Sequence, residues 1–304
     1  MRQYTIKEII TFSGIGLHSG TNVNVRIMPS AENTGIVFIR KDVAGSPRIK
    51  AEAGNVIATN YATTLGVKGV KVSTVEHLLA AFYGLGIDNA VVELDGPEVP
   101  VLDGSAAHFI EMLEGAGLKA QHALKTYLVI KKPIKVSEGD KYVLIQPSAD
   151  MDFSIDYSID FAHPFVARQS FSSQFSRDIF KDEVASARTF GFLNEVEALR
   201  ANGLARGGSL NNAVVISDTR ILNEGGLRYP DEFVRHKVLD MMGDISLAGM
   251  PIIGCISAHR SGHALNFKLV QQILRKRDCW EVSDSLEREE SKRFFIEDGA
   301  PALA

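Results

Sequence analysis

The spacing of hydrophobic and polar residues predicts strands in both halves of the chain. Apolar residues occupy every second position over residues 23–27 and again over 153–159, which is typical of strands with one buried face. β-branched and aromatic residues, which favour strands, fill these positions. Further strand-like runs cover residues 35–40, 89–94, 126–130 and 141–145.

Helical periodicity predicts fewer elements, namely residues 74–84, 105–115, 175–187, 192–202, 231–248 and 267–277. Each half therefore consists of several strands followed by a pair of helices, without the regular strand–helix alternation of a doubly wound sheet. This order favours an α+β fold with two layered domains. Residues 115–125, with two glycines and no periodicity, are the expected linker. We assign 1–120 and 126–280 to the two domains and 281–304 to a charged tail.

The composition excludes several classes of protein. The 304 residues are 45% hydrophobic and 23% charged, which is ordinary for a folded protein and excludes a disordered one. The longest nearly apolar stretch, residues 78–87, is half as long as a membrane-spanning helix, and the N-terminus carries charges where a signal peptide is apolar. We therefore expect a cytoplasmic protein with no transmembrane segment.

Charge and cysteine content narrow the chemistry further. The net charge of −4 lies in the C-terminal tail, so the rest of the chain offers no basic field for nucleic acid. Two cysteines, Cys255 and Cys279, are too few for a disulfide framework or a Cys-rich zinc site. A metal would then be bound by histidines and carboxylates. Three of the eight histidines, His108, His122 and His163, stand in no informative context.

The first informative site is residues 73–77, STVEH, at the start of a predicted helix. Ser73 and Glu76 have the S-x-x-E spacing of a capping box, in which Glu76 would only accept a hydrogen bond from a backbone amide. Alternatively, Glu76 and His77 place a carboxylate and an imidazole side by side, so that one binds a metal and the other transfers a proton. The residues alone leave both interpretations open.

The second site is the predicted helix 231–248, where His236, Asp240 and Asp244 follow one another at intervals of four residues. This spacing places them on one face, and an i, i+4 His–Asp pair can chelate one zinc ion. The simpler alternative is a solvated face with an ion pair, although short side chains and methionine-rich surroundings argue against exposure. Lys237 lies at the edge of this face, and the opposite, core-facing stripe comprises Val238, Met242, Ile245 and Gly249.

Two glycine-containing turns, residues 14–20 and 260–266, present His18 and His263 from loops. Either turn could be purely structural, and the sequence alone does not decide which histidine faces a cleft. Two histidines and one aspartate would leave a fourth zinc position open, which is the arrangement of a catalytic zinc rather than a structural one.

These motifs resemble a known family. The segments STVEHLLAAFYGLGIDN, EVPVLDGSAAHF, ASARTFGF and DEFVRHKVLDMMGDISL, followed by SGHALN, are similar to those of the zinc-dependent UDP-3-O-acyl-N-acetylglucosamine deacetylases of lipid A biosynthesis in Gram-negative bacteria. The likeness runs from about residue 4 to residue 280, with the motifs in order. It implies two similar domains, each a sheet with two helices and a small insert, with the helices packed between the two sheets.

The resemblance also implies roles for individual residues. The zinc ligands would be His77, His236 and Asp240. Glu76 would be the general base, and His263, supported by Asp244, the cationic partner and general acid. Thr189 would stabilise the oxyanion, and Lys237 would meet the oxyanion or the substrate's phosphates.

The second insert, residues 191–228, would shape an apolar passage for the substrate's acyl chain. Phe190, Phe192, Gly208 and Ser209 would lie along this passage, and Phe161 would lie near the nucleotide. Arg260 would contact phosphate, at a place that we associate more often with lysine. A guanidinium binds phosphate with a forked geometry that an ammonium lacks.

The implied reaction is hydrolysis of the acetamide of UDP-3-O-acyl-N-acetylglucosamine, the committed step of lipid A biosynthesis, with one Zn²⁺ per chain. Amide hydrolysis needs a nucleophile, a stabilised oxyanion and a proton for the leaving nitrogen, and the implied residues supply all three. Two alternatives remain without the resemblance. One is a metal-free hydrolase in which His236 and Asp240 form an orienting pair; the other is a non-catalytic module that binds a sugar nucleotide or a lipid.

The tail, residues 281–304, ends in the small, apolar sequence GAPALA. Its simpler interpretation is a terminal segment without function. The resemblance offers another, because some relatives have a similar end that marks them for a regulatory protease. We otherwise expect a monomer whose partner is its substrate.

Overall fold

The computed structural model describes residues 1–284 and consists of two halves with the same sheet topology. The first sheet has the order β2-β3-β9-β4-β5, and the corresponding strands of the second have the order β12-β13-β18-β14-β15. In both sheets the central strand, β9 or β18, is antiparallel to one neighbour and parallel to the other. The strands of the first sheet are β2 (Ile10–Ile15), β3 (Asn22–Pro29), β4 (Ile36–Arg40), β5 (Arg48–Lys50) and β9 (Ala90–Leu94). Those of the second are β12 (Ile134–Glu138), β13 (Lys141–Gln146), β14 (Phe153–Asp160), β15 (Arg168–Gln174) and β18 (Ile252–His259), and β11 (Tyr127–Ile130) and β19 (Trp280–Ser283) extend it.

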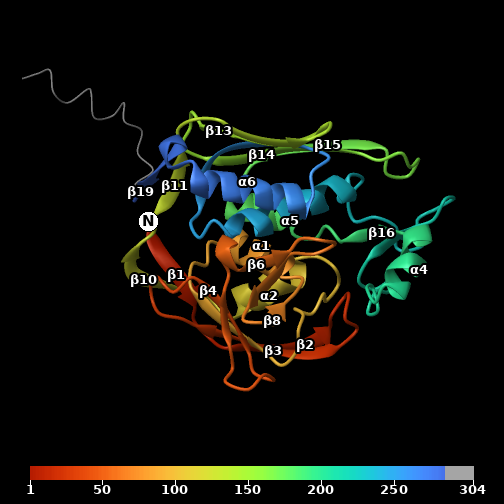
Figure 1. The fold of residues 1–304 in the computed structure, drawn as a ribbon, viewed down its shortest axis with the longest axis horizontal. Coiled ribbons are helices and arrows are strands. Elements are labelled where there is room, and N and C mark those ends of the chain that lie inside the picture. Colours follow the sequence, from red (N-terminus) through yellow and green to blue (C-terminus); the bar gives the residue numbers. More distant parts are fainter. Residues whose placement is uncertain (285–304) are drawn as a thin grey trace, which may run out of the picture.

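Two helices from each half lie between the two sheets (Figure 1). They are α1 (Glu76–Leu85) and α2 (Ala107–Gly115) from the first half, and α5 (Glu232–Ser246) and α6 (His263–Arg275) from the second. The helices take this position because each sheet has one apolar face. In β3 and β14, alternate side chains are buried beneath the helices while the others face outward. One apolar face per sheet requires a cover on that side only. The expected α+β architecture, with helices between two sheets, is confirmed.

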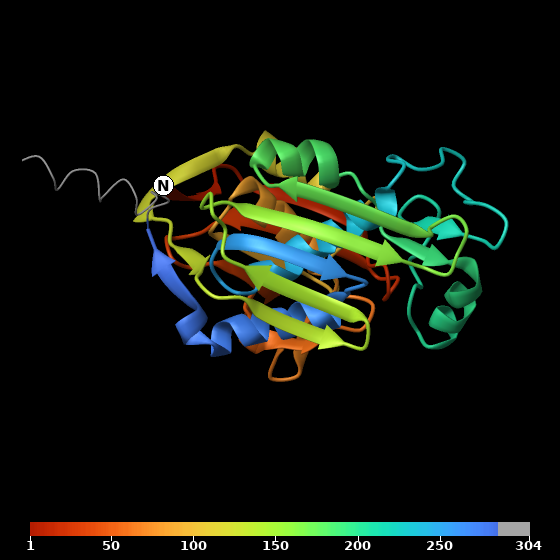
Figure 2. The ribbon, with the colours of Figure 1, turned by 90° about the horizontal axis from the view of Figure 1, so that it is seen from above.

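Each half also carries an insert beside its helices. The first is the small sheet of β6 (Val56–Ala58), β7 (Thr64–Val67) and β8 (Val70–Val72). The second comprises β16 (Phe190–Phe192), α4 (Leu193–Ala201) and β17 (Val214–Ile216), and it projects from one end of the molecule (Figures 1 and 2). Because β16 and β17 pair in parallel and α4 connects them, this insert is a βαβ unit.

Several local predictions were wrong. The expected linker contains a strand, β10 (Leu118–Leu124), which pairs with β1 (Arg2–Ile6) and which a weak apolar alternation concealed. Residues 175–187 form only the short α3 (Arg177–Ile179) and a π-helical segment (Phe180–Val184). Helix α6 begins at His263 rather than at residue 267. The prediction started too late because polar Asn266 interrupts the apolar stripe of this helix.

At the C-terminus, β19 extends three residues into the predicted tail. The remainder of that tail, with its proposed protease signal, lies outside the described residues, and the domain boundaries stay a prediction. Within residues 1–284, no helix has the length and apolar character needed to cross a membrane.

The two halves meet where α1 packs against α5, and Gly243 allows their backbones to approach closely (Figure 1). A Cβ atom added at Gly243 would lie 2.2 Å from the carbonyl oxygen of Glu76. The neighbouring atom belongs to the backbone, so α1 would have to shift. This contact places the first turn of α1 beside the middle of α5.

We therefore expect Gly243→Ala to destabilise the protein by about 1–3 kcal/mol, the usual range for overpacking a core. The matched control is Gly115→Ala, at the end of α2, where an added Cβ meets nothing within 4 Å. Urea unfolding of both variants measures the difference. Equal stabilities would contradict the close packing of α1 on α5.

Candidate active site and metal centre

Three side chains from the α1–α5 contact form a candidate metal site. The Nε2 atoms of His236 and His77 lie 3.3 Å and 3.6 Å from Oδ1 of Asp240. One ligand atom from each residue lies within 4.8 Å of the other two, and all three residues are buried. The imidazole rings of His77 and His236 face each other edge-to-face, with centroids 5.0 Å apart. Both histidines and Asp240 thus converge as the sequence analysis predicted.

The donor set fits a cation. Oδ1 of Asp240 is buried and has no hydrogen-bond donor among the described residues, although two imidazole nitrogens face it. A buried carboxylate oxygen without a partner is costly, and a bound ion would supply the missing partner. Two imidazoles and a carboxylate are ligands that zinc commonly takes.

The face of α5 that carries His236, Asp240 and Asp244 is not solvated, since each of these side chains is at most 2% exposed. The alternative of a solvated ion-pair face is therefore wrong. Lys237 donates to Oδ2 of Asp240 at 2.7 Å, so each oxygen of this carboxylate faces a different partner set. The opposite stripe is buried as predicted at Val238, Met242 and Ile245, but Gly249 lies beyond the end of α5 and is exposed.

Glu76 is not a capping residue. Val75 occupies the N-cap position of α1, and no side chain caps this helix. Instead, Oε2 of Glu76 accepts a hydrogen bond from the backbone N–H of Thr63 at 3.0 Å, and Oε1 lies 3.8 Å from Nε2 of His263. The capping-box interpretation is therefore wrong, and Glu76 points into the same cluster as the metal-site residues.

His263 is held by a buried carboxylate. Oδ2 of Asp244 accepts from Nδ1 of His263 at 2.8 Å and from the amide of Asn266 at 2.8 Å. Its other oxygen accepts from the hydroxyl of Thr63 at 2.6 Å. Since Asp244 fixes Nδ1, the other ring nitrogen of His263 faces Glu76 and Asp240, at 3.8 Å and 3.9 Å.

These surroundings set the charges of the two acid–base candidates. Burial raises the pKa of Glu76, and the nearby carboxylates of Asp240 and Asp244 add to this effect, while His263 opposes it. Burial alone would lower the pKa of His263, but the carboxylates of Asp244, Asp240 and Glu76 outweigh it and raise this pKa to about 10. His263 is thus a cation at neutral pH, and Glu76 holds a proton more readily than an exposed glutamate.

The pKa values of two metal-site residues, His236 and Asp240, are shifted downward. Burial lowers the pKa of His236 to about 3, so its imidazole is neutral. Burial alone would raise the pKa of Asp240, but neighbouring His236, Lys237 and His263 hold it well below its ordinary value. A neutral imidazole and an ionised carboxylate are the forms that bind a metal.

Aromatic side chains extend from the metal site toward the second insert. Phe190 packs edge-on against Phe233, with centroids 4.9 Å apart, and lies 6.4 Å from the ring of His236. Phe161 and Phe192 complete the cluster, with centroids 5.8 Å apart, and the ring of His163 packs at a tilt against Phe192, with centroids 5.0 Å apart. The three predicted phenylalanines therefore lie together. The cluster also contains His163, which the sequence did not single out.

Gly208 and Ser209 lie on a turn of the insert that contacts the N-terminal half. The preceding residue, Gly207, donates its N–H to the carbonyl oxygen of Leu17 at 3.0 Å. A Cβ added at Gly208 would lie 3.6 Å from the side chain of Leu17, which is ordinary contact. The amide of Ser209 is bound by the side chain of Asn212 at 2.8 Å.

Thr189, Lys237 and Arg260 differ in how closely the structure ties them to the cluster. Thr189 directly precedes β16, and its backbone is fixed by Gly104 and Val214, both at 2.8 Å. The ammonium of Lys237 lies over the ring of Phe190, 5.6 Å from its centroid. Arg260, in contrast, pairs with Asp140 at the turn between β12 and β13, and no contact joins it to the metal-site residues among those described.

The sequence left open which of the two glycine-containing turns reaches the site, and both do. His18 lies close enough for His263 and His77 to influence its pKa, which burial lowers. Its Nε2 is buried without a hydrogen-bond partner in the described part of the chain. The carboxylate of Glu98 anchors this turn through the N–H groups of His18 and Ser19, at 2.9 Å and 2.7 Å.

Sequence reasoning missed the supporting residues Thr63, Glu98 and Asn266. Thr63 and Glu98 act across sequence separations that no local pattern reveals. Asn266 could have been found, because it lies three residues after His263 on α6 and shares its face.

Comparisons with known proteins identify the family of the chain. The family model described as UDP-3-O-acyl N-acetylglycosamine deacetylase matches residues 3–275. A UDP-3-O-acyl-N-acetylglucosamine deacetylase from Acidithiobacillus ferrooxidans is 49% identical over 290 residues, covering 95% of each chain. One from Myxococcus xanthus is 50% identical over 94% of this chain and 91% of its own length. One from Citrifermentans bemidjiense is 48% identical over 99% of this chain and 98% of its own length. By these sequence matches, the chain belongs to the UDP-3-O-acyl N-acetylglycosamine deacetylase family.

Proposed function

We propose that this protein hydrolyses the acetamide of UDP-3-O-acyl-N-acetylglucosamine in a zinc-dependent reaction, releasing acetate in the committed step of lipid A biosynthesis. One observation carries the proposal: in a chain of this family, the buried ligand set His77, His236 and Asp240 lies beside a carboxylate, Glu76, and a cationic imidazole, His263. Zinc at this site would supply Lewis-acid activation of water and of the amide carbonyl.

The charges of the cluster support a divalent cation. Three buried carboxylates, those of Glu76, Asp240 and Asp244, face two cations, Lys237 and His263. This leaves an excess of one negative charge when both histidine ligands are neutral. A divalent ion would reverse the sign, and the site would then favour the negative charge that develops on an amide oxygen during attack.

Glu76 and His263 divide the proton transfers. Glu76 is the general base, because burial raises its pKa from the ordinary range toward that of a group able to accept a proton from water. His263 is the general acid: it is protonated, and its Nδ1 is engaged by Asp244, so that Nε2–H is the proton available to the leaving nitrogen. Oε1 of Glu76 and Nε2 of His263 lie 3.8 Å apart, which suits deprotonation of water and protonation of nitrogen at a single amide group.

Thr189 and Lys237 are assigned to negative charge on the substrate. Thr189 stands at the end of a segment fixed by backbone hydrogen bonds on both sides, which suits a pre-organised oxyanion donor. Lys237 is only partly buried and lies above Phe190, at the edge of the cluster. It can reach a phosphate or an oxyanion from this position.

The aromatic cluster is assigned to the rest of the substrate. Phe190 and Phe192 lead from His236 into the insert, where the turn with Gly208 and Ser209 meets Leu17. An acyl chain is apolar, and burying it against such side chains is favourable by about 0.8 kcal/mol per methylene group. Phe161 is assigned to the nucleotide side and Arg260 to a phosphate at the rim.

The metal requirement can be tested directly. Removal of bound metal with dipicolinate should abolish acetate release, and one equivalent of zinc per chain should restore it. The reason is that no other group of histidine, cysteine and carboxylate ligands with this proximity occurs among residues 1–284. Full turnover by metal-free protein would instead favour a hydrolase that needs no metal. Tight substrate binding without acetate release, at any metal content, would favour a binding module.

Glu76→Gln separates the chemistry from metal binding. Glutamine keeps the size of the side chain and can still accept the hydrogen bond from Thr63, but it cannot take a proton. We expect kcat to fall by about 10²–10⁴-fold, the usual contribution of a general base, while zinc content stays at one per chain. Metal analysis and an acetate assay on the same preparation decide this. Retained activity would reassign the base.

The pH profile tests the acid and the base together. Glu76 must be ionised and its pKa is raised, so kcat/KM should fall on the acidic side above the ordinary glutamate value of about 4.3. His263 must be protonated, so activity should fall again as pH approaches a pKa of about 10. The profile is therefore bell-shaped, and His263→Ala should remove its alkaline limb. An unchanged limb in this variant would assign the proton donor elsewhere.

A further inference from the structure

A backbone carbonyl fixes the orientation of one metal-site histidine. Nδ1 of His236 lies 3.0 Å from the carbonyl oxygen of Ala187. A carbonyl oxygen only accepts hydrogen bonds, so Nδ1 must carry the proton, and the lone pair of Nε2 is left free toward Asp240. The position of Ala187 therefore determines both the tautomer of His236 and the direction in which its ring points.

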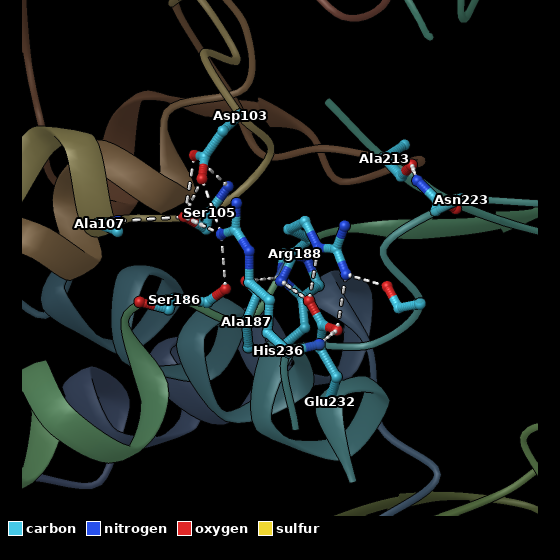
Figure 3. Close-up of polar contacts among 12 residues, drawn as sticks. Asp103, Ser105, Ala107, Ser186, Ala187, Arg188, Ala213, Asn223, Glu232 and His236 are labelled. Atoms are coloured by element: carbon cyan, nitrogen blue, oxygen red, sulfur yellow. Dashed lines mark hydrogen bonds and ion pairs between the residues drawn. The ribbon is translucent and has the colours of Figure 1, made fainter. Parts of the chain in front are cut away.

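A buried ion pair holds the segment that carries this carbonyl. Glu232 lies one helical turn before His236 on α5 and is 0% exposed. Its Oε1 accepts from the backbone N–H and from Nε of Arg188, at 2.9 Å and 2.8 Å, and its Oε2 accepts from Nη2 at 3.0 Å. Figure 3 shows this fork directly beside Ala187 and His236. Glu232 thus binds both the backbone N–H and the guanidinium of Arg188, the residue after Ala187.

The same carboxylate also binds the end of the insert. Oε2 of Glu232 accepts from the backbone N–H of Arg228 at 2.7 Å. The guanidinium of Arg228 donates to the carbonyl oxygen of Ser186 at 2.9 Å and to Asp103 at 2.7 Å. Ala187 is therefore tied on both sides, through Ser186 and through Arg188, to the region around Glu232 (Figure 3).

Stability alone does not account for this arrangement. A buried ion pair loses much of its Coulomb energy to desolvation, so an apolar pair of similar volume would stabilise the fold equally well. What the pair provides is geometry, because a guanidinium bound to a carboxylate through two N–H groups fixes distance and plane together. The feature that this geometry locates is the carbonyl oxygen that orients His236.

We infer that Arg188 and Glu232 are positioning residues for the metal site: their ion pair holds Ala187 so that His236 presents Nε2 to the metal. This inference rests on the proposed function, because it concerns a ligand of the proposed zinc. It extends to Thr189, which follows Arg188 directly and belongs to the same tethered segment.

The test compares Glu232→Gln with Asp231→Asn. Glutamine keeps the shape of the side chain but places an NH₂ group against N–H donors, which disrupts the fork. Asp231 forms an ion pair, at 2.6 Å, with Arg235, four residues later in the chain. This ion pair makes no contact with residues 186–189. Asparagine at 231 therefore removes a neighbouring, more exposed ion pair that does not hold Ala187.

Two quantities are measured on metal-stripped protein. Zinc affinity is determined by competition with a coloured chelator, and the Nδ1–H of His236 is followed in ¹H–¹⁵N spectra of histidine-labelled protein. We expect Glu232→Gln to weaken zinc binding by about 10–100-fold, the usual effect of losing a partner of a metal ligand, and to shift or broaden the Nδ1–H signal. Asp231→Asn should leave both unchanged.

Equal zinc affinities and an unchanged Nδ1–H signal in the two variants would overturn the inference. If wild-type protein fails to bind zinc, the proposed function is wrong, whereas the Nδ1–H signal of metal-free protein still reports on Ala187. If Glu232→Gln does not fold, Arg188→Lys replaces it. Lysine keeps the charge but loses the fork, and the same two changes are then expected, while wild-type values in that variant would refute the positioning role.

Discussion

The backbone contact between α5 and α1, where Gly243 meets Glu76, is the constraint on which the site depends. It brings two consecutive residues of the first half, Glu76 and His77, against the α5 residues of the second. Neither half holds a complete donor set by itself. Because each half covers one face of its sheet with helices, joining the halves places these helices at the centre of the molecule (Figure 1). The site is therefore buried for the same reason that the fold is stable.

Burying so many charges is costly unless each one is paired. Asp244 meets this requirement with three donors, namely Thr63, just before β7, and His263 and Asn266, both on α6. Asp240 meets it on one oxygen only, through Lys237, and its other oxygen faces two imidazoles. Asp244 is thus hydrogen-bonded on both oxygens, whereas Oδ1 of Asp240, at the metal site, has no hydrogen-bond donor among the described residues. This difference separates a position built for a protonated imidazole from one built for a cation.

The Gly243→Ala variant tests a contact that no sequence pattern could reveal, and the same limit applies to the rest of the structure. Alternation predicted β3 and β14 because their burial alternates, and helical spacing brought His236 and Asp240 together because one helix carries both. Alternation did not predict β10, because this strand is exposed on much of both faces. Helical spacing did not predict the start of α6, because Asn266 is a buried polar residue. Ser73 matched a capping box only in spacing. Thr63 lies 181 residues from its partner Asp244, and Glu98 80 residues from His18. Such partners follow from the tertiary fold, and only the family motifs pointed toward the set that they support.

The second insert belongs to the site more closely than its projecting position suggests. It begins with β16, directly after Thr189, and ends near Arg228. Both ends are tied to the one carboxylate of Glu232 on α5, through Arg188 and through Arg228 (Figure 3). Val214 on the returning strand also donates to the carbonyl oxygen of Thr189 at 2.8 Å. The base of the insert is therefore part of the frame that positions His236, and its outer turn is held against the N-terminal half by the hydrogen bond from the N–H of Gly207 to the carbonyl oxygen of Leu17.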